Sequence, residues 1–276
     1  MLCSGAEVLI VTGAGLSAPS GVPTFRGEAN SLWARFVLEY GTRSRFRADP
    51  LAWWNDFWLP AHTAFDPQTL QHKTFHPNPA HHALTSLAGR FPSLRLLTQN
   101  VDGLHLASGL KPEQMVEIHG RASLRKCIRA GCIYERARSI EAEPIALSRS
   151  DKGEPCISHL PLCPSCGEPC LPQVLLFDEM YDSHDFYEYR KATRWLDAAH
   201  AFVFVGTSFA VGITEHALSV AARKGAPVYN FNLVAGDYGE QAAELTGLNI
   251  VDIVGDCSVT LPKLVAAVEA LQPLLP

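Results

Sequence analysis

Five short apolar segments do most to limit the folds that are open to this chain. Each is rich in β-branched or large apolar residues and ends abruptly at a small or polar residue, as a strand buried on both faces does. They comprise residues 7–12, 93–98, 201–205, 227–231 and 249–254. Apolar residues recur between them at helical spacing, in a helix that opens near Pro79 and in another over residues 261–271. Strands alternating with helices predict an α/β fold with a doubly wound parallel sheet, which is Rossmann-like.

Two longer segments interrupt this alternation. Residues 27–73 contain four of the five tryptophans and no convincing sheet strand, which predicts an inserted helical subdomain. Residues 121–172 are rich in cysteine and are punctuated by proline and glycine, which predicts a small zinc-binding module. We therefore expect a single domain over residues 1–276, with its core at about 1–26, 74–120 and 173–276.

The composition narrows the class of protein. Hydrophobic residues make up 47% of the chain and charged residues 18%, which is enough apolar material for a packed core. The net charge of -5 and the lack of a basic run favour a protein without a nucleic-acid partner. No apolar run approaches the roughly 20 residues of a spanning helix, and no leader pattern opens the chain. We expect a soluble, unprocessed protein of the reducing cytoplasm, with no membrane partner.

A glycine-rich turn follows the first predicted strand, over residues 13–18. Glycines there let the backbone approach a pyrophosphate, and the next helix would offer its N-terminal N–H groups to that anion. A plain strand-to-helix connection explains the same residues equally well. An ordinary dehydrogenase would carry an acidic ribose ligand about 20 residues further on, after a second strand. Residues 30–40 contain no such strand, which weakens the dehydrogenase interpretation.

Two pairs of cysteines form the most specific motif. Cys127 and Cys132 are followed, after 30 residues, by Cys163 and Cys166. Four thiolates in two close pairs are the ligand set of a structural Zn2+ with no open position. Buried cysteines without a metal are the plainer alternative. Cys170 could replace one ligand of the second pair, but the tight knuckle spacing favours Cys163 and Cys166.

Polar residues also gather where predicted strands end. The segment 98–105, Thr-Gln-Asn-Val-Asp-Gly-Leu-His, directly follows the second strand, at the edge of a parallel sheet where ligands bind. A turn rich in Asn and Asp that satisfies its own backbone is the alternative. His119 follows in Glu-Ile-His-Gly, residues 117–120. A lone histidine is structural more often than catalytic, although its pKa suits proton transfer near neutral pH.

Taken together and in this order, these segments resemble the sirtuins, which are NAD-dependent protein lysine deacylases. The resemblance runs from about Glu7 to the C-terminal helix. It rests on residues 13–27, 98–105 and 117–120, the paired cysteines, residues 206–208 and Asn232.

The resemblance implies NAD as co-substrate and a role for single residues. His119 would be the general base on the ribose hydroxyls, and Asn100 would orient the ribose or a water molecule. The other cofactor-binding residues would be Gly13, Ala14, Gly15, Ser17, Phe25, Arg26, Gln99, Asp102, Gly206, Thr207, Ser208, Asn232 and Cys257. An acyl-lysine peptide would add a strand between residues 174–177 and the loop at 210–212. The residues in contact with it would be Val174, Leu175, Phe177 and Val211.

Several positions depart from the pattern of the family. Asp178 stands where the family has glycine in Phe-Gly-Glu, and its carboxylate is expected beside the substrate groove. Val234 replaces an acidic residue near the adenosine ribose. Thr24 is shared with the branch that removes acidic acyl groups, but Phe57 and Pro60 stand where that branch has its Tyr and Arg.

These departures favour an apolar acyl group. Arg43, Arg45 and Arg47 could supply a cation for an acidic one, but a solvated basic face is the preferred interpretation. Phe25 and Phe57 would then line an apolar acyl pocket. The sequence therefore predicts a protein lysine deacylase that releases nicotinamide and O-acyl-ADP-ribose. One alternative is a protein ADP-ribosyltransferase or NAD hydrolase on the same fold. Another is a non-catalytic protein that binds acyl-lysine or NAD.

Overall fold

The computed structural model describes residues 5–23, 38–62, 69–70, 73–143, 145–235, 248 and 250–271. The chain forms two compact units, each built from segments that are far apart in the sequence. The first comprises Met1–Val22, His76–Ile118 and Tyr189–Pro276, and the second comprises Pro23–Phe75 and His119–Glu188. The sequence assigns residues 23–26, 74–75, 119–120 and 173–188 to the core, but they belong to the second unit.

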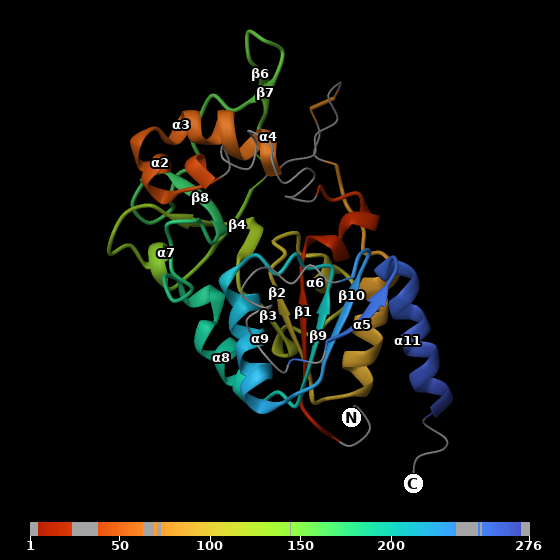
Figure 1. Ribbon diagram of the computed structural model, residues 1–276. Coiled ribbons are helices and arrows are strands. Elements are labelled where there is room, and N and C mark those ends of the chain that lie inside the picture. Colours follow the sequence, from red (N-terminus) through yellow and green to blue (C-terminus); the bar gives the residue numbers. More distant parts are fainter. Residues whose placement is uncertain are drawn as a thin grey trace. The chain divides into compact units, whose positions relative to one another are not determined.

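The described part of the first unit contains a six-stranded parallel sheet (Figure 1). Its strands are β1 (Val8–Thr12), β2 (Leu94–Thr98), β3 (Met115–Glu117), β9 (Ala201–Val205), β10 (Val228–Asn232) and β11 (Ile250–Val254). They lie in the order β11-β10-β9-β1-β2-β3, and Val8 of β1 lies opposite both Leu94 and Ala201. The chain thus runs outward from β1 to one edge and from β9 to the other, which confirms the predicted doubly wound fold.

Helices cover both faces of this sheet. α5 (Pro79–Arg90) and α11 (Cys257–Leu271) lie on one side, and α8 (Tyr189–Ala198) and α9 (Gly212–Lys224) lie on the other (Figure 1). The two helices that the sequence predicts, from Pro79 and over residues 261–271, are confirmed. The core between the sheet and the first helix pair includes Val8, Ile10, Leu84, Leu87, Leu96 and Leu261.

The strands of the sheet differ in burial. All five residues of β1 are buried, as predicted for a strand that is covered on both faces. The same prediction is wrong for β11, in which Val251 is 45% and Val254 is 58% exposed. β11 is an edge strand that pairs with β10 alone in the described sheet. An apolar run therefore predicts a strand here, but it does not distinguish an edge strand from a central one.

The second unit contains a smaller, antiparallel sheet. β4 (Gly120–Cys127) pairs with β5 (Ile140–Glu141) on one side and with β8 (Cys170–Val174) on the other, and β6 (Ser148–Arg149) forms a hairpin with β7 (Pro155–Cys156). The helical segments are α2 (Arg43–Ala48), α3 (Pro50–Ala52), the π-helical η4 (Trp53–Trp58), α4 (Leu59–His62), α7 (Ile133–Arg136) and the 3-10 turn η6 (Asp185–Tyr187). Where residues 27–73 are described, they are thus helical and contain no sheet strand, as predicted.

Aromatic side chains form the centre of this unit. Trp53 stacks on Trp58 with ring centroids 5.8 Å apart, and Phe57 packs against Trp53 at 5.1 Å. The indole of Trp54 donates a hydrogen bond to the carbonyl of Cys170, 3.1 Å away. The helical segment and the cysteine-rich module therefore share one core. Among the described residues, no helix is long and apolar enough to cross a membrane.

Candidate functional site

The glycines of the first motif lie at the switch point of the sheet, where the strand order reverses. The N–H of Gly15 donates to the carbonyl of Gly206, 2.8 Å away, so the loops after β1 and β9 touch backbone to backbone. A Cβ on Gly13 or Gly15 would lie 2.8 Å from atoms of Gly206. Gly206 itself has a φ of +58°, and its Cβ would lie 2.3 Å from the nitrogen of Leu16. All three positions require glycine, because any side chain would separate the two loops.

The chain after Gly13 differs from the expected continuation. Two 3-10 turns follow, η2 (Ala14–Leu16) and η3 (Ala18–Ser20), instead of the helix that the sequence predicts. Gly21 ends the second turn in the left-handed conformation, with a φ of +84°. The prediction of a helix N-terminus at this turn is therefore wrong, since each turn is too short to build a helix dipole.

Predicted site residues meet at the carboxyl ends of β1 and β2. The side-chain amide of Asn100 donates to the carbonyl of Gly13 at 3.0 Å and to the hydroxyl oxygen of Ser17 at 3.1 Å. The Ser17 hydroxyl in turn donates to the carboxylate of Asp102 at 2.6 Å. The second carboxylate oxygen of Asp102 accepts the N–H of Leu104 at 2.9 Å. These contacts fix the rotamers of Ser17, Asn100 and Asp102 at the rim of the sheet.

A layer of neutral polar groups supports this rim. The Thr12 hydroxyl donates to Thr98 at 2.8 Å and lies 3.0 Å from Nε2 of His105. The ring of His105 meets that of His81 edge to face, with centroids 5.1 Å apart. Burial lowers the pKa of His105 to about 3 and that of His81 to about 4, so both imidazoles are neutral at pH 7. Sequence reasoning missed Thr12 and His81 as supports.

His81 did leave a signal in the sequence. It is the third residue of α5, and its Nδ1 accepts the N–H of the N-cap residue Asn78 at 3.3 Å. The Asn78 side chain also accepts the N–H of Ala80 and donates to the carbonyl of Leu16 at 2.8 Å. An Asn-Pro-Ala-His start is a capping box in which histidine stands where Glu or Gln is usual. That box ties the start of α5 to the glycine turn.

The remaining predicted residues of the first unit follow β9, β10 and β11. The side-chain amide of Asn232 donates to the carbonyl of Thr207 at 2.9 Å, and that of Gln99 donates to the Thr207 hydroxyl at 3.3 Å. The thiol of Cys257 lies 3.6 Å from the carbonyl oxygen of Gly15, and burial raises its pKa to about 11. Cys257 is thus a neutral donor that steadies the glycine turn. Ser208, in the loop that follows β9, is exposed.

His119 stands at the start of the small sheet in the second unit. Its carbonyl accepts the N–H of Leu175 at 2.8 Å, and its ring stacks on that of Tyr181 with centroids 6.0 Å apart. Gly120 has a φ of +88°, and a Cβ there would lie 2.0 Å from the carbonyl oxygen of Gln173. The glycine after the histidine therefore lets β8 approach the backbone at His119, and this approach fixes the histidine beside residue 175.

The predicted peptide-binding segment begins inside β8. Val174 is the last strand residue, and it is buried, whereas Phe177 is 57% exposed. The N–H groups that follow are bonded within the unit: Leu175 to His119, Leu176 to the carboxylate of Glu179 at 3.0 Å, and Phe177 to the carbonyl of Gly41 at 3.0 Å. The carbonyl oxygens of Val174 and Leu176 also accept hydrogen bonds within the unit, from the ammonium of Lys126 at 2.8 Å and from the N–H of Glu179 at 3.0 Å. Val211, at the N-cap of α9, belongs to the first unit.

The four predicted zinc ligands come together. The sulfur atoms of Cys127, Cys132, Cys163 and Cys166 all lie within 4.8 Å of one another. Two pairs, Cys127 with Cys166 and Cys132 with Cys163, are 3.5 and 3.7 Å apart. Sulfurs bound tetrahedrally to one Zn2+ at about 2.3 Å would be about 3.8 Å apart, so the cluster fits this metal. Cys170 is outside the cluster, which decides between the alternatives left open by the sequence.

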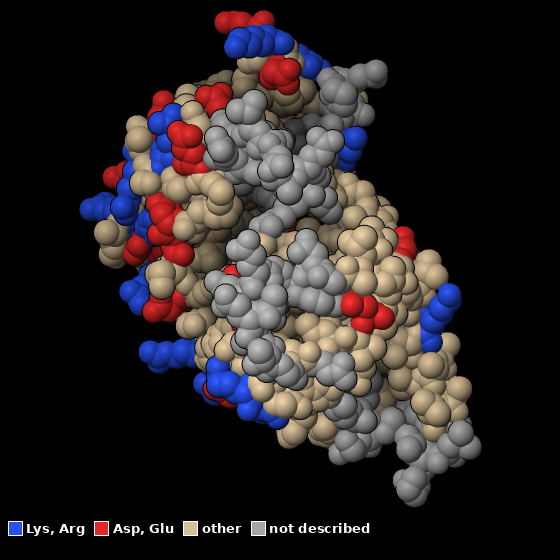
Figure 2. All heavy atoms as spheres, viewed as in Figure 1, with Lys and Arg blue, Asp and Glu red and all other residues tan. Residues whose placement is uncertain are grey.

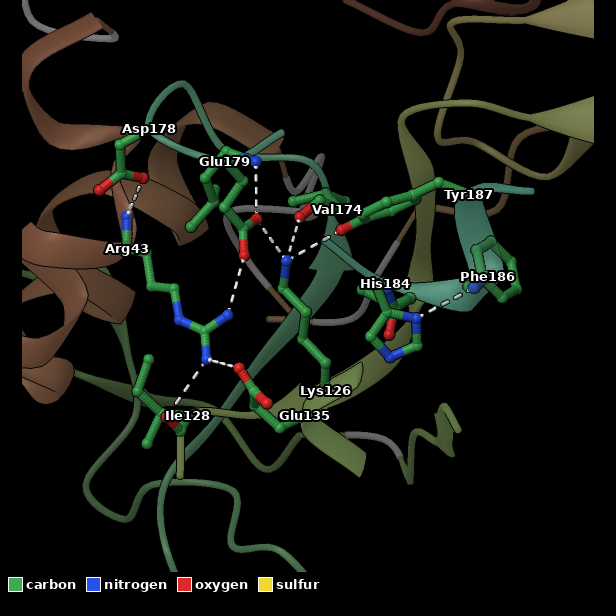
Figure 3. A network of polar contacts seen from close by, with 12 residues as sticks. Arg43, Lys126, Ile128, Glu135, Val174, Asp178, Glu179, His184, Phe186 and Tyr187 are labelled. Atoms are coloured by element: carbon green, nitrogen blue, oxygen red, sulfur yellow. Dashed lines mark hydrogen bonds and ion pairs between the residues drawn. The ribbon is translucent and has the colours of Figure 1, made fainter. Parts of the chain in front are cut away.

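Of the three arginines expected on a solvated basic face, Arg45 and Arg47 are exposed, and the expectation is wrong for Arg43. The carboxylate of Asp178 accepts the N–H groups of Arg43 and Ser44, at 2.6 and 3.0 Å, and is thus held by the first turn of α2 (Figure 3). Asp178 is exposed, and its position beside a substrate groove stays a prediction. Arg43 does not belong to a solvated basic face, because its guanidinium pairs with Glu135 at 2.7 Å and Glu179 at 3.1 Å. Its side chain is 11% exposed.

The residues predicted around the cofactor loop and the acyl pocket are described only in part. Phe25 and Arg26 lie outside the described residues, as does Thr24. Phe57, which the sequence assigns to an acyl pocket, is 2% exposed and packs within the tryptophan cluster.

Comparison with known proteins identifies relatives that align with most of the chain. A family model described as "Sir2 family" matches residues 13–212. The chain is 39% identical over 267 residues to NAD-dependent deacetylase sir2E of Dictyostelium discoideum, covering 95% of this chain and 74% of that protein. It is 34% identical to an NAD-dependent protein deacylase of Pseudomonas putida, covering 96% and 92%. A solved Sir2 homologue in complex with NAD has a TM-score of 0.70 at 27% identity, covering 96% and 90%.

Proposed function

The chain belongs to the Sir2 family, and we propose that it is an NAD-dependent protein lysine deacylase that releases nicotinamide and O-acyl-ADP-ribose. The observation that carries this proposal is the hydrogen-bonded set of Ser17, Asn100 and Asp102 at the switch point of the sheet. Ligands of doubly wound folds bind at this point. The polar side chains there are held in place before any ligand arrives, as a binding site requires.

The residues of the first unit would hold NAD. We assign the phosphates to the turn at Gly13, Ala14, Gly15 and Ser17, with Phe25 and Arg26, and the nicotinamide end to Gln99, Asn100 and Asp102. We assign the adenosine half to Gly206, Thr207, Ser208, Asn232 and Cys257. Bound NAD would supply a ribose carbon that the acyl oxygen attacks as nicotinamide departs. The backbone contact between Gly15 and Gly206 supports this assignment, because it joins the phosphate and adenosine loops.

His119 would take a proton from a ribose hydroxyl, so that this hydroxyl can attack the acyl carbon. Its backbone contact with Leu175 and the stacking of its ring on Tyr181 restrict the imidazole to one orientation. The four thiolates would hold Zn2+ as a structural ion, because four protein ligands leave no open position for substrate. The zinc would thus stabilise the fold around β4 and take no part in the reaction.

The substrate would be an acyl-lysine protein or peptide that contacts Val174, Leu175, Phe177 and Val211. An apolar acyl group is supported by the engagement of Arg43 with Glu135 and Glu179, which removes one candidate cation for an acidic acyl group. We propose no nucleic-acid partner. Among the described residues on the face drawn in Figure 2, lysine and arginine are interspersed with aspartate and glutamate and do not form a continuous basic patch.

We also propose the cytoplasm as the compartment of this protein. The four clustered cysteines must stay reduced to bind zinc, and a reducing compartment keeps them so. Cell fractionation with an antibody against the protein tests this proposal, and a signal confined to an oxidising compartment would contradict it.

The deacylase proposal is tested by mass spectrometry of acetyl-, butyryl-, myristoyl- and succinyl-lysine peptides incubated with NAD. We expect the wild type to yield free lysine and O-acyl-ADP-ribose, and His119→Ala to yield neither. His159→Ala, at an exposed histidine of the second unit, is the matched control and should retain activity. Consumption of NAD without deacylation, or ADP-ribose attached to protein, would instead favour the hydrolase or transferase.

A further inference from the structure

One buried charge has no part in the function proposed above. Lys126 lies on β4 beside the zinc ligand Cys127, and its side chain is 1% exposed. Its ammonium group donates to the carbonyl of Val174 at 2.8 Å, to the hydroxyl oxygen of Tyr187 at 2.9 Å and to the carboxylate of Glu179 (Figure 3). A lysine has three N–H donors, so all of its hydrogen-bonding capacity is used.

Glu179 completes the arrangement from the other side. The carboxylate oxygen that accepts Lys126 also accepts the N–H of Leu176 at 3.0 Å. The second oxygen accepts Arg43 at 3.1 Å. The ion pair therefore binds the two backbone groups that flank Leu175. Lys126 holds the carbonyl of Val174, and Glu179 holds the N–H of Leu176.

The register of the sheet explains why this segment needs such a pair. Leu175 directs its N–H to His119, and Val174 lies opposite Gly120. In an antiparallel pair, the residue next to a hydrogen-bonded one turns its own backbone groups away from the partner strand. The carbonyl of Val174 and the N–H of Leu176 therefore depend on side chains for their partners, and they find them in Lys126 and Glu179.

We propose that Lys126 and Glu179 are positioning residues that fix the backbone of residues 174–177, and thereby Phe177, for the acyl-lysine peptide. This inference rests on the proposed function, which places the peptide at this segment. Loss of the pair would leave the segment free to adopt other conformations, and peptide binding would have to select the correct one. The effect would fall on the KM for the peptide and not on the KM for NAD.

The main competing interpretation is that the pair only stabilises the fold. The two interpretations separate in a double variant. Removal of Glu179 leaves Lys126 buried and unpaired, and removal of Lys126 leaves Glu179 with Arg43 as its ion-pair partner. Removal of both charges of a buried pair often restores stability. Lys126→Met with Glu179→Gln removes both charges but supplies no ammonium to the carbonyl of Val174.

Steady-state kinetics with an acyl-lysine peptide, together with thermal unfolding, test the proposal. We expect Lys126→Met to raise the peptide KM by about tenfold, which one unmade hydrogen bond to a buried carbonyl can cause, with the NAD KM unchanged. The double variant should unfold near the wild-type temperature yet keep the raised peptide KM. Glu179→Asp, a milder change that withdraws the carboxylate from Leu176, should shift the peptide KM in the same direction. Lys152→Met, at an exposed lysine of the same unit, should change nothing.

Two results would overturn the proposal. The first is a double variant in which stability and peptide KM recover together, since the pair would then be structural only. The second is an equal rise in the KM for NAD, since the effect would then not be specific to the peptide segment. A wild type that releases no free lysine would refute the proposed function itself and would be seen before any variant is measured.

Discussion

The two units differ in how they satisfy their buried polar groups. Beneath the candidate NAD site of the first unit, a network of hydroxyl, amide and imidazole groups is neutral and includes Thr12, Asn100 and His105. Beside the candidate peptide segment of the second unit, the network is charged and is formed by Lys126, Glu179 and Arg43. Each network supports a segment that the proposed function assigns to a ligand, and the second contains the ion pairs of Glu179 with Lys126 and Arg43.

The two units also differ in topology. The first unit has a parallel sheet covered by helices on both faces, which buries a continuous apolar core. The second has short strands and short helices around a tryptophan cluster. In the second unit, a zinc ion and ion pairs would hold together segments whose positions apolar contacts alone do not fix. We therefore expect perturbations of charge and metal to affect the second unit first.

Removal of zinc should have the largest effect. Binding of a structural Zn2+ by four thiolates contributes on the order of 10 kcal/mol to folding, which exceeds the stability that most small units have. We expect chelation, or Cys127→Ser, to unfold the second unit while the sheet of the first unit persists. Hydrogen exchange, measured peptide by peptide, should then rise over residues 119–188 and stay low in β1 and β2.

Cys156→Ser is the matched control, because this thiol lies on β7 outside the cluster. It should bind zinc and exchange hydrogen as the wild type does. Simultaneous loss of protection in both units would break the comparison, since the first unit would then depend on the metal as well.

Sequence reasoning succeeds where a short run of residues is enough to indicate the local structure. The buried run of β1, the helix from Pro79 and the two cysteine pairs fall in this class. The exposure of β11 does not, because a strand's hydrophobicity does not specify how many neighbours it has. The pairing of β8 with β4 also escaped sequence reasoning, since the register depends on Gly120 and on contacts across about 50 residues of sequence.

The candidate site shows the same limit. The resemblance to sirtuins names Gly15 and Gly206, but only the structure shows that they contact each other. The sequence predicts a solvated basic face for Arg43 and does not single out Lys126, because no local pattern marks a lysine or arginine whose partners lie elsewhere in the chain. Partners of this kind are fixed by the fold, so they emerge only when the fold is known.

Acid should weaken the first unit by a smaller amount. Burial holds the pKa of His105 near 3, against 6.5 in the unfolded chain, so below pH 6.5 only the unfolded state gains a proton. Stability is therefore fully present above pH 6.5 and falls with decreasing pH, by up to about 1.4 kcal/mol per pH unit from this residue. His105→Asn should be less stable at pH 7 but should show a shallower decline between pH 6.5 and 4.

Urea unfolding at pH 7, 6 and 5 measures this decline. His159→Asn, at an exposed histidine of the second unit, serves as the control and should follow the wild type. Parallel curves for His105→Asn and the wild type would mean that the imidazole is not kept neutral in the folded state. The two units would then no longer differ in having a neutral and a charged network.

The smallest effect is expected at Asp178, and it separates a structural charge from one that selects substrates. The N–H groups of Arg43 and Ser44 lower the pKa of Asp178, although burial acts in the opposite direction. Asp178→Gly restores the residue usual in the family and removes the acceptor of these N–H groups, which should destabilise the protein by about 1 kcal/mol. Because the carboxylate is already held by α2, the ratio of kcat/KM for basic and acidic acyl-lysine peptides should stay within about twofold of the wild type. A ratio that shifts toward acidic peptides, without loss of stability, would show that the Asp178 charge acts on the peptide and not on α2.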